Sequence, residues 1–331
     1  MKNSAQAQPI GLDIGTSRIV VARQNDKKYE HDVQLNAFLA LPYSKLTENL
    51  MVQGNVFHEV RDKEILVVGN DAGKFAEVFH AETRRPMYKG VLNPNEPHSL
   101  AVVRRIIARM AGRATVEGQK AFFSVPAPAD NTEGSLAYHE ESIRQILTEL
   151  GYEATPITEG LAVVFGELGA SNYTGIGISC GSGLCNVCVA VLSLPVISFS
   201  VTKAGDYIDS QAALATGEVT TRMRIHKEQS FRFNGFSSDR VHNALTVYHD
   251  EVIRSLVEGL EKQIVSTRNL PKFDQSVRVV VSGGTAMPDG FLERFEKALR
   301  ASAFPVPISD VWLAADPLHS TANGALLAAQ C

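Results

Sequence analysis

Several features that would fix the compartment of a protein are missing from this 331-residue sequence. No window approaches the ~18 consecutive apolar residues that a membrane-spanning helix needs, so we expect no integral membrane association. The segment MKNSAQAQP at residues 1–9 lacks the apolar core of a secretory signal. It also lacks the paired large apolar residues of a membrane-binding amphipathic helix. These absences favour a cytoplasmic protein.

An excess of charge of one sign is also missing. The 32 Lys and Arg residues against 36 Asp and Glu residues give a formal net charge of −4. Because nucleic-acid binding domains are usually basic or carry a basic stripe, we expect no nucleic-acid partner. Hydrophobic residues make up 44% and charged residues 21% of the chain. This ordinary composition excludes the disordered, collagen-like and coiled-coil classes, and the length allows about two domains.

Cysteine is scarce, with four residues in all: Cys180, Cys185, Cys188 and Cys331. A structural zinc site needs four closed ligands, and only the remote Cys331 or a histidine could complete the set. A free cysteine otherwise packs as a small hydrophobic residue. We therefore expect the three neighbouring cysteines to be buried in a β segment rather than to bind a metal.

The pattern of apolar residues predicts an α/β protein in two related halves. Each half contains a strand, a glycine-rich turn and a returning strand, at residues 11–22 and 177–191. Helical spacing predicts helices over residues 97–111, 133–150, 159–168, 241–264, 291–301 and 320–330. Apolar runs predict further strands over residues 121–125, 154–157, 195–202 and 277–281. Residues 23–89 are polar and mixed, and no pattern assigns elements there.

Two motifs imitate known active sites. Residues 69–75, GNDAGKF, resemble a P-loop, but the spacing is one residue short and Phe75 stands where a Ser or Thr would hold Mg²⁺. Residues 177–181, GISCG, match the G-x-S-x-G pattern of serine hydrolases, in which the serine lies between a strand and a helix. Here a returning strand follows, so the hydrolase is disfavoured. Labelling of Ser179 by an active-site phosphonate would reveal one.

The two glycine-rich turns suggest phosphate binding. Backbone N–H groups of a turn can converge on an anion, so two facing hairpins can hold a polyphosphate between two domains. Asp13, at the end of the first strand, can then hold Mg²⁺ through water, because Mg²⁺ dehydrates reluctantly. One such hairpin would be an ordinary turn. Two of them at related positions favour a site for a nucleotide.

Five segments carry a resemblance to the actin-like ATPase superfamily. In chain order they resemble its first phosphate loop, first interdomain connector, second phosphate loop, adenosine motif and second connector: GLDIGTS (11–17), TEGLA (158–162), SCGSGL (179–184), VSGGTAMP (281–288) and ANGAL (322–326). Within the superfamily the chain is most similar to bacterial filament proteins of the MreB and MamK kinds. That closer resemblance lies in RPMYKGVL (85–92), TKAGDYID (202–209) and KEQ (227–229).

The resemblance implies an actin-like fold of two ribonuclease-H-like domains around a nucleotide cleft. It divides the chain into four subdomains: IA (1–22 and 90–158), IB (23–89), IIA (159–209 and 265–331) and a reduced IIB (210–264). It also implies ATP or ADP with Mg²⁺ as cofactors, and other copies of the chain as filament partners.

The matched motifs imply a set of site residues. The nucleotide-binding residues are expected to be Asp13, Gly15, Thr16, Ser17, Ser179, Gly181, Ser182, Gly183, Gly205, Asp206, Lys227, Glu228, Gly283, Gly284, Thr285 and Met287. Asp13 is also expected to hold Mg²⁺ through water. Glu159 is the candidate for orienting the attacking water, by accepting its proton or by aiming it. The alternative is that Glu159 only complements the dipole of its helix.

Three residues depart from the family pattern, and the departures bear on the rate of ATP hydrolysis. Ser179 stands where the second phosphate loop normally has Asp, and a neutral hydroxyl brings no negative charge to a hydrated Mg²⁺. Asn186 lies where bacterial relatives often have an acid. Gly160 replaces a common proline, which could loosen the hinge between domains. We therefore expect any ATP hydrolysis to be slow or impaired.

The leading hypothesis is an actin-like cytoskeletal protein that binds ATP and Mg²⁺ and assembles into filaments. The alternative is a non-polymerising adaptor or pseudo-ATPase that uses nucleotide only to set a conformation. A small-molecule kinase would need a separate acidic base facing a substrate pocket, and the sequence offers none that we can identify.

Overall fold

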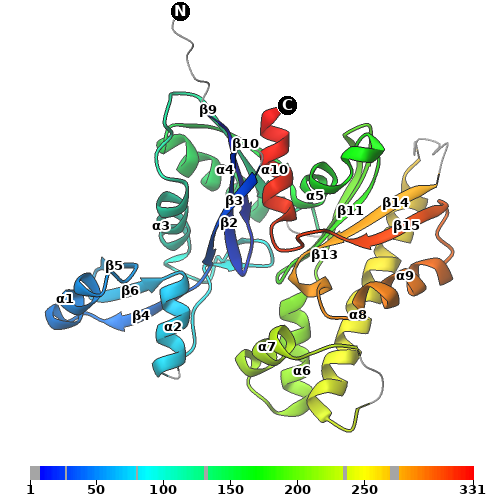
Figure 1. Cartoon of the computed structure of the whole chain (residues 1–331). Coiled ribbons are helices and arrows are strands. Elements are labelled where there is room, and N and C mark those ends of the chain that lie inside the picture. Colours follow the sequence, from blue (N-terminus) through cyan, green and yellow to red (C-terminus); the bar gives the residue numbers. More distant parts are fainter. Residues whose placement is uncertain (1–7, 27, 80, 130–132, 234–236, 269–275) are drawn as a thin grey trace, which may run out of the picture.

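Two five-stranded sheets form the framework of the protein (Figure 1). The structure, a computed structural model, describes residues 8–26, 28–79, 81–129, 133–233, 237–268 and 276–331. The strand order is β10-β9-β1-β2-β3 in the first sheet and β13-β12-β11-β14-β15 in the second. The first sheet consists of β1 (Ile10–Ile14), β2 (Arg18–Asn25), β3 (Lys28–Leu35), β9 (Gln119–Val125) and β10 (Tyr152–Thr158). The second consists of β11 (Gly175–Cys180), β12 (Cys185–Val191), β13 (Leu194–Val201), β14 (Val277–Ser282) and β15 (Ile308–Leu313).

The two sheets repeat one plan. In each, an antiparallel hairpin (β1/β2 or β11/β12) is flanked on one side by a third antiparallel strand. On the other side lie two parallel strands that follow a helical crossover. The prediction of an α/β protein in two related halves is thus confirmed. The register ends at Ile14↔Ile19 in one hairpin and at Cys180↔Cys185 in the other, so both glycine-rich segments are hairpin turns.

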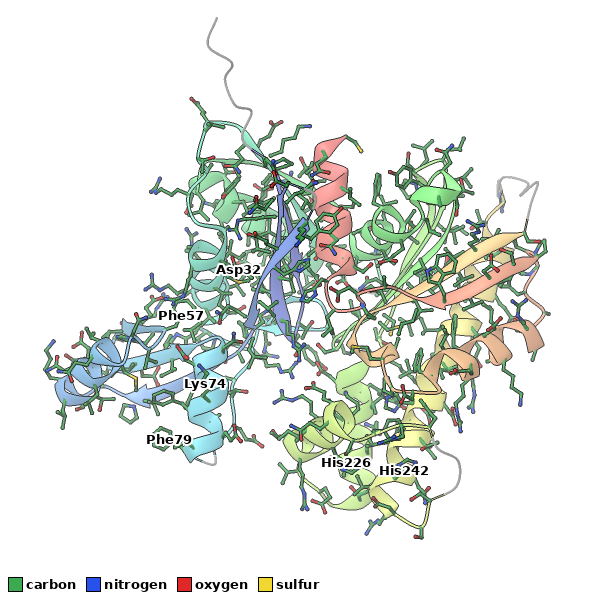
Figure 2. The ribbon with its side chains drawn as sticks, in the orientation of Figure 1. Asp32, Phe57, Lys74, Phe79, His226 and His242 are labelled. Atoms are coloured by element: carbon green, nitrogen blue, oxygen red, sulfur yellow. The ribbon has the colours of Figure 1, made fainter. Side chains whose placement is uncertain are left out.

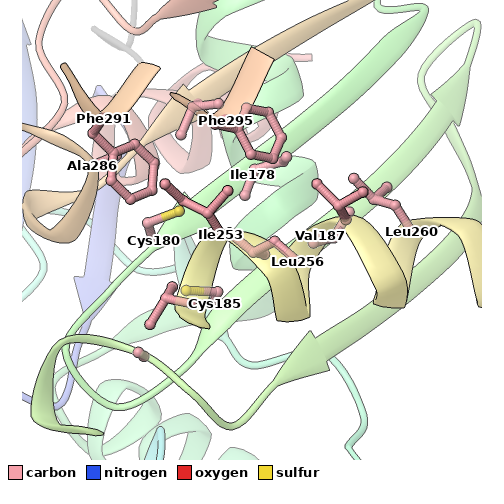
Figure 3. Close-up of a cluster of buried hydrophobic side chains, with 14 of the residues drawn as sticks. Ile178, Cys180, Cys185, Val187, Ile253, Leu256, Leu260, Ala286, Phe291 and Phe295 are labelled. Atoms are coloured by element: carbon pink, nitrogen blue, oxygen red, sulfur yellow. The ribbon is translucent and has the colours of Figure 1, made fainter. Parts of the chain in front are cut away.

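Helices cover both faces of each sheet. Between the sheets lie α5 (Glu159–Glu167) and α10 (Ser320–Gln330), which pack on each other (Figure 1). On the outer faces lie α3 (Ser99–Ala111) and α4 (Glu133–Glu149) in one half, and α8 (Arg240–Ser266) and α9 (Phe291–Ala301) in the other. Each half has its own core, and Figure 3 shows part of the second, where Ile253 and Leu256 of α8 meet Ile178 and Val187 of the sheet.

Two smaller lobes complete the molecule. The first contains β4 (Phe38–Pro42), α1 (Lys45–Gln53), β5 (His58–Arg61), β6 (Glu64–Val68) and α2 (Asn70–Phe79), and the short pair β7 (Met87–Tyr88) and β8 (Val91–Leu92) leads back to the first sheet. The second contains α6 (Gly205–Thr216), α7 (Thr220–Gln229) and the start of α8. Figure 2 shows Lys74 and Phe79 on α2 in one lobe, and His226 and His242 on α7 and α8 in the other. The subdomain boundaries drawn from the sequence stay a prediction.

The structure adds elements that the sequence pattern did not assign. None of the elements within residues 23–89 was predicted, and α6, α7 and β15 were not predicted either. The reason in α7 is that Met223 is its one buried side chain, so the helix lacks an apolar stripe. In α6 the buried face consists mostly of small residues such as Ala212 and Ala213. Among the described residues, no helix combines the length and the apolar character that crossing a membrane requires.

Cysteine and glycine residues near the hinge have packing roles. Cys180, Cys185 and Cys188 are buried free cysteines in β11 and β12, as predicted, and two of them appear in Figure 3. A Cβ atom on Gly160 would lie 2.6 Å from the backbone nitrogen of Cys188. The glycine therefore allows α5 to approach β12 closely. This is a different role from the looser hinge expected from the sequence.

Candidate functional site

A cavity of about 540 Å³ opens between the two halves. The two hairpin turns, the loop after β14, the end of α7 and the segment before α10 form its walls. Of the residues predicted from the sequence, those lining it are Asp13, Gly15, Thr16, Ser17, Glu159, Ser179, Gly181, Ser182, Gly183, Lys227, Glu228, Gly283, Gly284, Thr285 and Met287. Segments from at least five separate parts of the chain thus meet at one cleft.

The first hairpin turn is held by a hydrogen bond within the turn and by bonds to the two segments that connect the first sheet with the small lobe. The backbone N–H of Gly15 donates to the carbonyl of Arg18 at 3.0 Å. The Thr16 hydroxyl accepts a hydrogen bond from the backbone N–H of Gly90 at 3.0 Å. Asn36 donates its side-chain amide to the carbonyl of Gly15 at 2.9 Å. The turn is therefore fixed before any ligand arrives.

The second hairpin turn is braced from behind. The backbone N–H groups of Gly205 and Asp206 donate to the carbonyls of Gly181 and Ser182 at 3.2 and 2.7 Å. The Thr285 hydroxyl donates to the same Gly181 carbonyl at 2.7 Å. Gly205 and Asp206 do not line the cavity, so the structure places these two predicted residues in a supporting position. Asp206 instead forms an ion pair with Arg85 at 3.3 Å.

The two turns meet tip to tip. A Cβ atom on Gly183 would lie 2.4 Å from the Thr16 hydroxyl oxygen and 3.0 Å from the backbone nitrogen of Gly90. A glycine is therefore required at this position for the halves to close this far. The Ser182 hydroxyl is buried and has no hydrogen-bond partner among the described residues. An unpaired buried hydroxyl in a phosphate-loop motif marks a place where a ligand oxygen could bind.

Two carboxyl groups lie at the bottom of the cleft. Glu159 begins α5, and its Oε2 accepts a hydrogen bond from the Ser179 hydroxyl at 3.0 Å. Asp13 Oδ1 accepts a hydrogen bond from the Ser124 hydroxyl at 2.9 Å. The same Ser124 oxygen accepts from the backbone N–H of Ile14 at 2.8 Å. Ser124 orients Asp13 and was not found from the sequence, because it lies in a separate strand 111 residues away.

Burial controls the charge of both carboxyl groups. It raises the pKa of Glu159 from 4.5 to about 8, and the negative charge of Asp13 adds to the effect. Hydrogen bonds from Ser179 and Asn186 partly oppose it. Burial also raises the pKa of Asp13, to about 6, against the hydrogen bond from Ser124 and the nearby His319. A cation would reverse these shifts, because it favours the ionised forms.

Lys227 is bound to a residue that the sequence analysis did not assign to the site. Its ammonium group forms an ion pair with Asp209 at 2.8 Å and donates to the carbonyl of Gly205 at 3.0 Å. Burial raises the pKa of Asp209, and Lys227 opposes that shift. The neighbouring Glu228 lies 3.8 Å from Arg18 of the other half. A buried lysine needs a buried acid, and that rule could have directed attention to Asp209.

Other lining residues were also missed. The apolar ones include Phe231, Pro288 and Leu318, which line the wall of the cleft. Arg18 and Gly90 complete the first hairpin side. Single apolar residues in loops carry no periodic signal, so the sequence offered no means of selecting them.

The two imitation motifs do not form active sites. Ser179 ends β11 and is followed by an antiparallel strand, so the strand-to-helix turn of a hydrolase is absent. Its hydrogen-bond partner is a carboxyl group, not a histidine. Residues 69–75 precede and begin α2 and do not line the cavity.

The repeated sheets with a cleft between them form an actin-like fold. A filament structure of MamK matches with a TM-score of 0.72 and 20% identity, over 97% of this chain and 98% of that one. MreB5 of Spiroplasma citri bound to AMPPNP matches at 0.65 and 14%, over 95% and 93%. The ethanolamine utilization protein EutJ of Carboxydothermus hydrogenoformans matches at 0.53 and 18%, over 96% and 89%. These likenesses establish the fold.

The chain belongs to the Volactin family, which it matches over residues 9–329. No curated protein sequence matches it.

Proposed function

We propose that this protein binds ATP with Mg²⁺ in the cleft and assembles into filaments, with slow or impaired hydrolysis. The observation that carries the proposal is the tip-to-tip arrangement of two glycine hairpins across one cavity. A polyphosphate lying between them would accept hydrogen bonds from both turns. Structures of a non-polymerising MamK mutant and of MreB5, bound to AMPPNP, share the fold and support the choice of nucleotide.

The residues at the bottom of the cleft fit a hydrated Mg²⁺. Asp13 and Glu159 are buried carboxyl groups whose ionised forms are disfavoured, and a cation would stabilise them. Asp13, oriented by Ser124, would hold the ion through water. When bound, Mg²⁺ supplies positive charge to the phosphate oxygens. The ribose and base would lie toward Glu228, Met287 and the buried Lys227–Asp209 pair.

Slow hydrolysis follows from the serine at position 179. Glu159, with a pKa raised to about 8 by burial and by Asp13, would accept a proton from water only after a bound cation has stabilised its ionised form. An aspartate at position 179 would add negative charge for a hydrated cation, which serine cannot. Ser179 instead places its hydroxyl on Glu159 Oε2. Both effects reduce turnover more than binding.

Hydrolysis is tested by phosphate release under single-turnover conditions. We expect Ser179→Asp to raise the rate and Glu159→Ala to lower it, while Glu153→Ala, an exposed acid on β10, leaves it unchanged. The nucleotide dissociation constant should change less than the rate. Equal rates in the first two variants and the wild type would refute this role for the pair.

Assembly is supported by the likeness to the MamK double helical filament and is tested by sedimentation, light scattering and electron microscopy. We expect pelleting with ATP or AMPPNP and less with ADP. Protein that stays in the supernatant with every nucleotide would refute polymerisation. If nucleotide nevertheless raises the melting temperature, the non-polymerising adaptor is the function; ligand at 100 times its dissociation constant should stabilise the fold by about 2.7 kcal/mol.

The cellular setting is part of the same proposal. We infer a cytoplasmic protein that acts on copies of itself and has no nucleic-acid partner, in keeping with its near-neutral charge.

A further inference from the structure

A group of three ligand-forming side chains lies outside the nucleotide cleft, where the first sheet meets the segment that enters α10. His31 is on β3, and Asp316 and His319 lie between β15 and α10. One possible ligand atom of each residue lies within 4.8 Å of those of the other two. We propose that this group is a binding site for a borderline transition metal ion of the Zn²⁺, Ni²⁺ or Cu²⁺ class.

The hydrogen bond of His31 favours metal binding. His31 Nε2 lies 2.7 Å from Asn323 Oδ1, and His319 Nδ1 lies 2.8 Å from Asp316 Oδ2. Both oxygens accept, so these ring nitrogens donate and the lone pairs are on His31 Nδ1 and His319 Nε2. Metal-binding histidines usually donate their second N–H to an oxygen acceptor, as His31 donates to Asn323. Asp316 cannot accept from His319 Nδ1 and bind the same ion as His319 Nε2, so its hydrogen bond to His319 must break before the carboxylate coordinates.

The rings must move a short distance to bind one ion. They are stacked, with centroids 4.2 Å apart and planes 8° from parallel, so their in-plane lone pairs do not converge. His319 has 23% of its side chain exposed and can turn out of the stack. Asp316, with 51% exposed, is free to follow it. Binding of the ion would thus separate the two stacked imidazole rings and stabilise a side-chain arrangement close to the one observed.

The ligand types select the class of ion. Two imidazoles and one carboxylate suit zinc, nickel and copper, whereas Mg²⁺ and Ca²⁺ prefer sets made of oxygens. Mg²⁺ should therefore not compete at this site. With three ligands from the chain, one or more coordination positions would remain for water.

The position of the site links it to the cleft. The Pro317 carbonyl, between Asp316 and His319, accepts hydrogen bonds from the backbone N–H of Gly283 and the hydroxyl of Ser282, both at 2.9 Å. An ion that joins His31 to this segment would tie β3 of the first sheet to the loop after β14. Metal binding should therefore stabilise the closed arrangement of the two halves, whether or not nucleotide is bound.

The single tryptophan of the chain provides the probe. Trp312 lies four residues before Asp316, which limits their Cα separation to about 14 Å. Cu²⁺ quenches indole fluorescence over such short distances. We would titrate the full chain with Cu²⁺, and with Zn²⁺ by calorimetry, without nucleotide or Mg²⁺. The background substitution Cys331→Ser removes the exposed thiol, which could bind either ion.

We expect one ion per chain, saturable quenching, reversal by chelator and a higher melting temperature with Zn²⁺. His31→Gln and Asp316→Asn should each weaken metal binding at least tenfold. Asn323→Ala should weaken it about tenfold, because the Asn323 side chain no longer fixes which ring nitrogen of His31 carries the proton. The control His58→Gln, on β5, should bind as the parent does. Unchanged affinity in both ligand variants, or no binding by the parent, would overturn the site. Neither result bears on nucleotide binding, which is measured separately.

Discussion

Three buried ionisable side chains, those of Glu159, Asp13 and His139, have pKa values shifted toward the uncharged form. In Glu159 and Asp13 the shift belongs to the cleft between the halves, where a bound cation would reverse it. In His139, on α4, it belongs to the core, because both ring nitrogens are buried without a partner. Burial therefore prepares a cation site in the cleft and lowers the stability of the fold in α4.

Glu159 makes apo stability depend on pH. Its pKa in the folded state is about 8, above the ordinary value of 4.5. The contribution of protonated Glu159 to the free energy of unfolding is therefore fully present below pH 4.5 and is lost as the pH rises toward 8. We expect Glu159→Gln, which has no charge, to melt several degrees above the wild type at pH 8.5 and close to it at pH 5. Calorimetry without ligand measures this, with Glu153→Gln as control. A difference of equal size at both pH values would contradict the assignment.

His139 acts in the opposite pH range. Burial lowers its pKa from 6.5 to about 4, so its neutral form contributes stability that is present above pH 6.5 and lost as pH falls toward 4. His139→Leu removes two unpaired polar atoms, each of which costs about 1–3 kcal/mol. We expect the variant to be more stable than the wild type, with a larger gain at pH 5 than at pH 8. Denaturant unfolding at the two pH values, with His58→Leu as control, tests it.

At the scale of elements, the contact between α5 and α10 joins the two halves. A Cβ atom on Gly324 would lie 1.7 Å from the carbonyl oxygen of Ala162, and one on Gly11 would lie 2.3 Å from the carbonyl oxygen of Ala322. These glycines allow α10 to approach both α5 and β1. The residues of the second connector motif therefore make a close backbone contact. This contact explains why a glycine stands inside a helix, where alanine would otherwise be favoured.

Gly324→Ala should reverse the usual effect of this substitution. Alanine in a helix normally gains about 1 kcal/mol over glycine, but here the methyl group meets backbone that cannot yield. We expect a loss of about 1–3 kcal/mol or more. In the control Gly73→Ala, on α2, the new methyl meets only a terminal methyl group of Leu35, so stability should stay equal or rise. Chemical unfolding of both variants measures these changes in the free energy of unfolding.

At the scale of the whole molecule, two ion pairs between described residues cross from one half to the other. Arg85 lies 3.3 Å from Asp206, and Arg18 lies 3.8 Å from Glu228. All four side chains are partly exposed, and such pairs contribute about 1 kcal/mol or less each. They therefore bias the closed arrangement without locking it, and salt should weaken them.

We expect the apo protein to open when these pairs are removed. In the double variant Arg18→Gln/Arg85→Gln, the radius of gyration measured by small-angle scattering should exceed that of the wild type at low salt. High salt should expand the wild type toward the same value. Loss of one pair should change nucleotide affinity less than about fivefold. Arg144→Gln, whose ion-pair partners lie on its own helix, is the control, and equal radii at all salt concentrations would contradict the idea.

Much of the cleft was predictable because its parts are local. Each of the two hairpins has a short glycine-rich turn between two apolar runs, and such a pattern indicates the same structure wherever it occurs. The Ser179 departure was visible for the same reason. The small lobe of residues 38–79 was not predictable, since short mixed strands become stable only by packing on one another.

The sequence by itself determined the main strands and helices outside residues 23–89, the two hairpins, the position of Glu159 at the start of α5 and the burial of three cysteines. The tertiary structure alone decided which side chains meet: Ser124 with Asp13, Asp209 with Lys227, and His31 with the segment before α10. The reason is that backbone conformation responds to neighbours along the chain. Burial, charge and side-chain contacts depend on residues brought together from distant parts of it.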